Sequence, residues 1–157
     1  MKQKLFFHVF ISTGFGSGYF PKAPGTAGAV VATLIWFGIS LLLTPCQLLT
    51  ATAILIIVFT ILGVWSSGIM ESHWGKDPSK VVIDEMVGVW IPLLCVSDRN
   101  IYFALAALLL FRFFDILKPL GIRKMEAIEG GWGIMLDDIL AGLYSLIIIF
   151  ALRWFIG

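Results

Sequence analysis

Residues 81–96 read VVIDEMVGVWIPLLCV, an apolar run that carries two adjacent carboxylates, Asp84 and Glu85. Asp115 closes a second apolar run, and Asp137 and Asp138 stand just inside a third. An ionised side chain in hydrocarbon costs at least about 2.5–3.5 kcal/mol, so such acids persist only where they face a protein interior and meet a cation. These acids therefore predict metal chemistry in a membrane protein.

The composition is too apolar for a soluble domain. Of 157 residues, 59% are hydrophobic and 13% are charged, and the mean hydropathy is +0.98, whereas an ordinary globular chain is about 45–50% apolar. The formal net charge of +1 excludes a strongly basic nucleic-acid binder, and no nucleic-acid partner is expected. Cys46 and Cys95 lack the spacing of a zinc or redox motif, so buried free thiols are expected.

The apolar runs predict an all-α fold, a polytopic membrane bundle of about five transmembrane helices, because about 20 residues cross the hydrocarbon core. The expected spans are 27–43, 48–70, 81–96, 101–117 and 134–155. The third is short and could tilt or begin below the headgroups. Residues 2–11 have too brief an apolar run for a signal peptide, so an interfacial helix is expected there. Residues 1–157 are expected to form a single integral membrane domain.

The loop charges predict the orientation of the bundle. With a cytoplasmic N-terminus, only Arg99 and Arg153 fall outside, in agreement with the positive-inside rule. The cations that fall inside are Lys2, Lys4, Lys22, Lys76, Lys80, Lys118, Arg123 and Lys124. The short loops 44–47 and 97–100 are then external, and all the clustered acids lie at the cytoplasmic end.

Helical spacing places two acids on the same face as a glycine. Asp84 and Gly88 are four residues apart, as are Asp138 and Gly142, so each pair shares a helix face. Close helix approach at the two glycines would turn both aspartates inward. The neighbouring acids, Glu85 and Asp137, lie about 100° around their helices and flank the site or face a neighbour.

Carboxylate oxygens are hard ligands that suit Mg²⁺, Mn²⁺ or Ca²⁺ better than zinc or copper. Mg²⁺ commonly takes its remaining ligands from water and substrate phosphates, so a phosphate-handling site is natural. Arg112 and Asp115 lie three residues apart on one helix face, where they could serve this site or simply neutralise each other.

Candidate phosphate-binding groups surround the acids. The segments 14–18 (GFGSG) and 24–28 (PGTAG) precede the first span, where backbone N–H groups could meet an anion and Thr26 is placed to act as the N-cap. Interfacial turns would use the same glycines. Lys22, Lys118 and Arg123 could hold a substrate phosphate or anchor the chain at lipid headgroups.

Other functional classes fit less well. His8 and His73 lack the sequence context of a histidine phosphatase, and His73 is expected to be a solvated loop residue. A divalent-cation transporter would also contain buried acids, but it would distribute polar groups toward the midplane and both faces. A structural membrane subunit would need no acid cluster. No obligate protein partner is evident.

Several motifs together resemble one family over nearly the whole chain. They are Gly16-Ser17-Gly18 with Pro21, Pro24-Gly25-Thr26 with Gly28, Asp77, Val82-Ile83-Asp84-Glu85 with Gly88, Phe111-Arg112-Phe113-Phe114-Asp115 with Lys118-Pro119, and 131–138 (GWGIMLDD) with Ala141-Gly142. In this order they closely resemble the phosphatidylglycerophosphatase A family. One departure is visible, since the family's KPxPI segment reads Lys118-Pro119-Leu120-Gly121-Ile122 here.

The resemblance implies a Mg²⁺-dependent phosphatase of the bacterial inner membrane that converts phosphatidylglycerophosphate to phosphatidylglycerol. On this hypothesis Asp84, Asp137 and Asp138 hold one or two Mg²⁺ ions, with Glu85 or Asp115 in support, while water attacks in line. A carboxylate could act as the base.

The same hypothesis assigns the substrate contacts to Arg112, Lys118 or Arg123, with Lys22 as a further candidate. A covalent route through Ser17 or Thr26 stays open, although neither has a base adjacent in sequence. The lipid substrate would stay in the bilayer, among other membrane lipids, with its headgroup entering from the cytoplasmic side.

The orientation can be checked by cysteine labelling in intact and permeabilised cells. After replacement of Cys46 and Cys95, single cysteines within 71–80 and 118–133 should react only when reagent reaches the cytoplasm, because the loop cations are retained there. A cysteine within 44–47 should react from outside. External labelling of 118–133 would contradict the shared cytoplasmic end.

Overall fold

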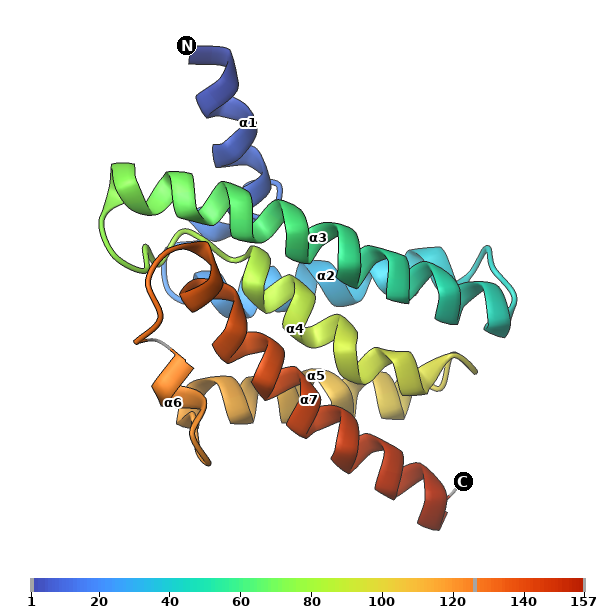
Figure 1. The fold of residues 1–157 in the computed structure, drawn as a ribbon. Helices are drawn as coiled ribbons and strands as arrows, with labels where there is room; N and C mark the ends of the chain where they lie inside the picture. The colour runs from blue at the N-terminus through green and yellow to red at the C-terminus, as the bar shows by residue number, and fades with distance from the viewer. Residues whose placement is uncertain (1, 126, 157) are drawn as a thin grey trace.

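The computed structural model of the chain describes residues 2–125 and 127–156, and within that part it contains helices and no strand. The side chains of Lys2 and Lys4, which enter the charge argument, lie outside the described residues. In chain order the elements are α1 (Lys2–Ser12), η1 (Ser17–Tyr19), α2 (Pro24–Ser40), α3 (Pro45–Trp74), α4 (Ile83–Leu93), η2 (Leu94–Val96), α5 (Ile101–Leu117), α6 (Ile122–Met125) and α7 (Gly131–Ile156). The all-α expectation is confirmed (Figure 1).

Each expected span coincides with a helix, but the helices differ in their ability to cross a membrane. Only α3 and α7, among the described helices, are long and apolar enough to do so by length and composition. The 17 residues of α2 and of α5 rise only about 25 Å at 1.5 Å per residue. The structure thus supports two spans, and the other three stay predictions.

The two long helices carry apolar surface that the fold leaves uncovered. Only 17% of the most apolar window of α3 and 22% of that of α7 are buried inside the molecule. Ile57 and Ile61 on α3, and Ile147 and Phe150 on α7, are exposed. Uncovered apolar faces of this extent are typical of surfaces that meet lipid or a partner rather than water.

The helix ends follow local chemistry. Thr44 caps α3 through a reciprocal capping box with Gln47, so residues 45–47 form its first turn, and the expected loop at 44–47 is wrong apart from Thr44. Pro92 lies in the last turn of α4, which passes directly into η2, because proline lacks the N–H that would continue the helix. Cys46 and Cys95 are free thiols as expected, but the expectation that they are buried is wrong, because Cys46 is exposed and Cys95 is only partly buried.

The segments that carry the clustered acids gather at one end of the bundle. The starts of α2, α4 and α7 and the ends of α3 and α5 lie together, at the left of Figure 1, and α1 packs against α3 and projects above it. The Val82 amide donates a hydrogen bond of 2.8 Å to the Ser12 carbonyl, which joins the end of α1 to the start of α4. The expected convergence of the acids at one end is therefore confirmed as geometry.

Helix α4 is the centre of the bundle. Its residues from Met86 to Leu93 are all buried, and it packs against α2, α3, α5 and α7. The Trp90 indole donates a hydrogen bond of 2.9 Å to the Ala32 carbonyl of α2 and meets the Phe59 ring of α3 edge to face. An apolar helix enclosed in this way holds its first turn in a fixed position.

Two glycines allow α4 and α7 to touch through their backbones. A Cβ atom added to Gly142 would lie 2.5 Å from the Gly88 carbonyl oxygen, and one added to Gly88 would lie 2.9 Å from the Asp138 carbonyl oxygen and 2.3 Å from the Phe111 ring. Asp84 and Asp138 are 8% and 2% exposed. The prediction that close approach turns both aspartates inward is confirmed.

Replacing Gly88 by Val should destabilise the protein by about 1–3 kcal/mol, because overpacking forces shifted side chains and backbone. Thermal unfolding of the purified protein in detergent would measure the loss as a lower Tm. Gly38→Ala is the matched control, since a Cβ there meets nothing within 4 Å, and it should leave Tm unchanged or slightly higher. A Gly88→Val protein as stable as wild type would contradict the tight helix contact.

Candidate active site

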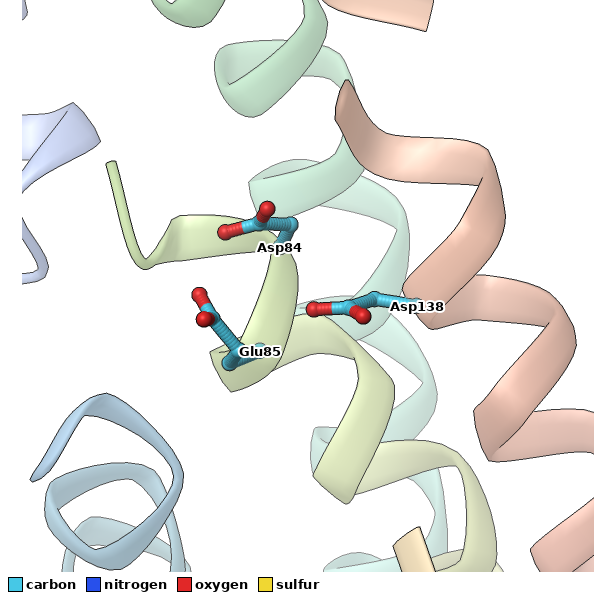
Figure 2. A group of neighbouring side chains, drawn as sticks. All are labelled: Asp84, Glu85 and Asp138. Atoms are coloured by element: carbon cyan, nitrogen blue, oxygen red, sulfur yellow. The ribbon is translucent and has the colours of Figure 1, made fainter. Parts of the chain in front are cut away.

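Three carboxylates from two helices converge at the polar end of the bundle. Asp84 and Glu85 belong to the first turn of α4, and Asp138 comes from α7 (Figure 2). Each offers an oxygen that lies within 4.8 Å of the other two. Among the described residues, Asp84 Oδ1 and Glu85 Oε2 are buried and have no hydrogen-bond partner. Buried, unpartnered carboxylate oxygens at this spacing fit a hard divalent cation.

Helix ends help to hold these charges. Asp84 and Glu85 lie at the N-terminus of α4, where the helix dipole favours negative charge. The start of α2 also approaches Glu85, because a Cβ added to Gly25 would lie 2.1 Å from Glu85 Oε1. No side chain caps either helix start. A side chain at position 25 would therefore displace the Glu85 carboxylate from its present place.

The three acids line a cavity of about 390 Å³, which we call the carboxylate cavity. Its lining consists of Ala23, Pro24, Gly25, Asp77, Pro78, Ser79, Val81, Asp84, Glu85, Arg112, Asp115, Ile116, Lys118, Asp137 and Asp138. All five acids predicted from the sequence are present, together with two of the predicted cations. The cavity therefore combines ligands for a metal with donors for an anion.

Asp137 faces this cavity but does not belong to the group of three. Its Oδ2 accepts a hydrogen bond of 2.6 Å from Lys118 Nζ, and its Oδ1 is buried without a partner among the described residues. Lys118 ends α5 in a left-handed conformation with φ 47°, which redirects the chain after the helix. The ligand role expected for Asp137 stays a prediction, and the structure adds a role in holding Lys118.

Arg112 and Asp115 form the ion pair that their spacing on α5 allows. The two side chains thus neutralise each other, which was one of the two interpretations that the sequence allowed. Both side chains nevertheless line the carboxylate cavity, and Arg112 Nε is buried without a partner in the described part of the chain. Pairing therefore orients Arg112 without removing it from the site.

The remaining candidates lie elsewhere. The Ser17 hydroxyl donates to the Gly14 carbonyl at 2.9 Å, and neither Ser17, Lys22 nor Thr26 lines the carboxylate cavity. The N-cap of α2 is Ala23, so the expectation that Thr26 caps this helix is wrong. Arg123 lines a neighbouring cavity. His73 is exposed as expected, in the last turn of α3.

Close packing accounts for two glycines of the Gly-rich segments. A Cβ on Gly18 would lie 2.0 Å from the Lys80 carbonyl oxygen, and one on Gly28 would lie 2.8 Å from the Val82 Cβ. These contacts press η1 and α2 against the chain that leads into α4. The Gly-rich segments 14–18 and 24–28 were predicted to bind an anion or to form turns. In the structure, their glycines help to position the acids of α4.

The family comparison agrees with this site. The model of the family described as phosphatidylglycerophosphatase A matches residues 10–153, which include every residue of the carboxylate cavity. The chain belongs to the phosphatidylglycerophosphatase A family.

Three relatives of this chain carry names that specify two different phosphatase activities. A phosphatidylglycerophosphatase A of Haemophilus influenzae is 39% identical over 92% of this chain and 87% of its own. Its counterpart in Escherichia coli is 35% identical over 86% and 77%. A protein of Bacteroides thetaiotaomicron, 56% identical over 100% of both chains, carries the provisional name phosphatidylinositol-3-phosphatase. No solved structure matches this member of the family.

Sequence reasoning gave no role to several lining residues. Asp77 stood only among the family motifs, and Gly25 only among these motifs and in the Gly-rich segment 24–28. Glu71 and Lys76 line the neighbouring cavity but were not candidates. The available signal was the polar segment 71–80 at the same end as the acids. It could not show which of these side chains meet.

Replacing Gly25 by Ala should impair the site while preserving the fold, because the new methyl group would displace the Glu85 carboxylate. If phosphate release depends on Mg²⁺ as the sequence predicts, the Mg²⁺ concentration for half-maximal release should rise about tenfold or more, because displacements of about 1 Å are costly at such sites. Gly38→Ala serves again as the control for a Gly→Ala change on α2. If the Gly25→Ala variant showed an unaltered Mg²⁺ dependence, Glu85 would not be a ligand of the metal.

Proposed function

We propose that this protein hydrolyses the terminal phosphomonoester of an anionic phospholipid headgroup, with phosphatidylglycerophosphate as substrate and phosphatidylglycerol and phosphate as products. The reaction depends on Mg²⁺ and takes place at the cytoplasmic face of a bacterial inner membrane. The observation that carries the proposal is the buried group of Asp84, Glu85 and Asp138, which shares a cavity with Arg112 and Lys118. The names of the two phosphatidylglycerophosphatase A relatives support the substrate.

The donor set fits Mg²⁺. Asp84, Glu85 and Asp138 would hold the ion, with Asp137 as the further ligand predicted from the sequence. When bound, Mg²⁺ supplies charge neutralisation at the phosphomonoester and activation of the attacking water. Three carboxylates on the rigid ends of α4 and α7 keep their oxygens close together before the ion arrives.

The protein's own cations would position the phosphate. Lys118 and Arg112 line the carboxylate cavity and can donate to nonbridging phosphate oxygens, Arg112 through a planar fork. Asp137 and Asp115 orient these two cations by ion pairs. Phosphoryl transfer requires mostly positioning and electrostatic stabilisation, and both follow from a site built on helix ends.

Asp137 is a candidate for the base that accepts a proton from the attacking water. Asp137 lines the cavity, and its Oδ1 is buried and lacks a partner within the described residues. It could therefore take a proton from the attacking water while Oδ2 stays bonded to Lys118. No covalent intermediate is needed, and the Ser17 hydroxyl is already bonded to backbone carbonyls.

The arrangement in the membrane supports a lipid substrate. The uncovered apolar faces of α3 and α7 support a location beside lipid. The segments that line the carboxylate cavity meet at one end of the bundle. A headgroup can reach the acids while its acyl chains stay in the bilayer. A transporter would place polar groups toward the midplane and both faces, whereas the three-carboxylate group lies at one end.

Phosphatidylinositol-3-phosphate is a second candidate substrate. The observation in its favour is the 56% identical relative whose provisional name specifies that activity. Both lipids present a phosphomonoester on a polyol that is linked through a phosphodiester to diacylglycerol. The same metal group and cations would serve either reaction.

Replacing Asp84 or Asp138 by Asn should lower Mg²⁺-dependent phosphate release at least about a hundredfold, roughly 2.7 kcal/mol, because the amide keeps the size but loses the charge. Purified variants in mixed micelles would be assayed with both lipids. Near-normal turnover in both variants would exclude these residues as essential ligands.

Asp98→Asn is the matched control for the loss of one carboxylate. Asp98 pairs with Arg153 at 2.6 and 2.9 Å, at the far end of α7, and the hydrogen bonds from Arg153 lower the pKa of its carboxyl. This variant should retain activity. A similar loss in Asp98→Asn would point to general instability instead of metal binding.

A further inference from the structure

A second cavity adjoins the carboxylate cavity. It has a volume of about 530 Å³ and is lined by Glu71, Lys76, Asp77, Arg123, Ala127, Ile128, Gly133, Ile134 and Asp137. Asp77 and Asp137 line both cavities, so the two cavities lie side by side and share these two side chains. A phosphate held in the carboxylate cavity would therefore lie next to the second cavity.

Separate segments build this second cavity. Glu71 lies near the end of α3, Lys76 in the turn that follows, and Arg123 on α6. Gly75 leaves α3 with a φ of 91°, and Asp77 adopts a φ of 45°. This left-handed backbone is uncommon for residues other than glycine, and it turns the chain sharply between α3 and α4. The sharp turn brings Lys76 and Asp77 beside α7.

The charges in this cavity are mixed. Glu71, Asp77 and Asp137 contribute carboxylates, and Lys76 and Arg123 contribute cations. Within the described part of the chain, neither Lys76 nor Arg123 has an acidic partner within 4 Å. Three carboxylates would repel a second phosphate. A lining with both donors and acceptors instead suits hydroxyl groups, which both donate and accept hydrogen bonds.

We propose that the second cavity is a polyol subsite, in which Glu71 and Asp77 accept hydrogen bonds from headgroup hydroxyls while Lys76 and Arg123 donate to them. This inference rests on the proposed function, since the phosphomonoester must occupy the carboxylate cavity. The volume lies in the usual range for small-molecule sites, about 300–1,000 Å³. It is large enough to admit a sugar-like ring.

The subsite would discriminate between headgroups. An inositol ring presents several free hydroxyls in a rigid arrangement, whereas the glycerol of phosphatidylglycerophosphate presents a single one on a flexible chain. More of the charged lining groups are therefore satisfied by inositol, and preorganisation lowers the entropy lost on binding. The names of two relatives differ in the same respect, because one specifies an inositol headgroup and the other a glycerol headgroup.

The test compares the double variant Glu71→Gln/Lys76→Gln with wild type on phosphatidylinositol-3-phosphate and phosphatidylglycerophosphate in mixed micelles. We expect the ratio of the two kcat/KM values to move about tenfold against the inositol lipid, mainly through KM, because the lost contacts bind ground state and transition state alike. Lys124→Gln is the control, since Lys124 is exposed beside Arg123 but lines neither cavity. An unchanged ratio in the double variant would overturn the subsite.

Calorimetric titration with soluble headgroups separates this inference from the proposed function. Wild-type protein should bind myo-inositol 3-phosphate more tightly than glycerol 3-phosphate, and the double variant should lose most of that difference. A wild-type protein that hydrolyses neither lipid would refute the proposed function, and the titration would still decide the subsite. Equal affinities for the two headgroups in wild type would refute the subsite even if both lipids are hydrolysed.

Discussion

The backbone contact between α4 and α7 is the constraint on which the rest of the structure depends. Gly88 and Gly142 have no side chain, so the two helices meet at a separation that a single added Cβ would prevent. Asp84 and Asp138 each lie four residues before one of these glycines, on the same face. The contact that packs the apolar centre of the bundle therefore also brings the two aspartates together.

Gathering carboxylates in an apolar bundle is unfavourable unless charge and dipoles compensate. Here the cations Arg112 and Lys118 pair with Asp115 and Asp137 on the rim of the cavity. The uncapped start of α4 adds its dipole. Asp84 and Glu85 each retain a buried oxygen without a partner, so compensation within the described residues is incomplete, and a divalent ion would complete it.

On the proposed function, the two adjacent cavities would divide the chemistry from the recognition of the headgroup. The carboxylate cavity is built on the ends of α4, α5 and α7, whose positions are fixed by packing. The second cavity takes most of its charged lining from α6 and the connection after α3, which are short or irregular. Binding specificity can vary in such segments while a rigid scaffold preserves the reaction, which fits relatives whose names specify different headgroups.

The sequence by itself determined the helical class, the approximate place of every long helix and the acids of the site, because apolar runs and misplaced charges are local signals. It also predicted the glycine contact, since spacing on one helix fixes which residues share a face. Only the tertiary structure decided that Asp138 joins Asp84 and Glu85 while Asp137 binds Lys118. Which of the two aspartates joins the group depends on how α7 is rotated about its axis relative to α4 and α5. Helical periodicity does not determine this rotation. The second cavity was invisible for the same reason, because it forms where segments distant in sequence meet.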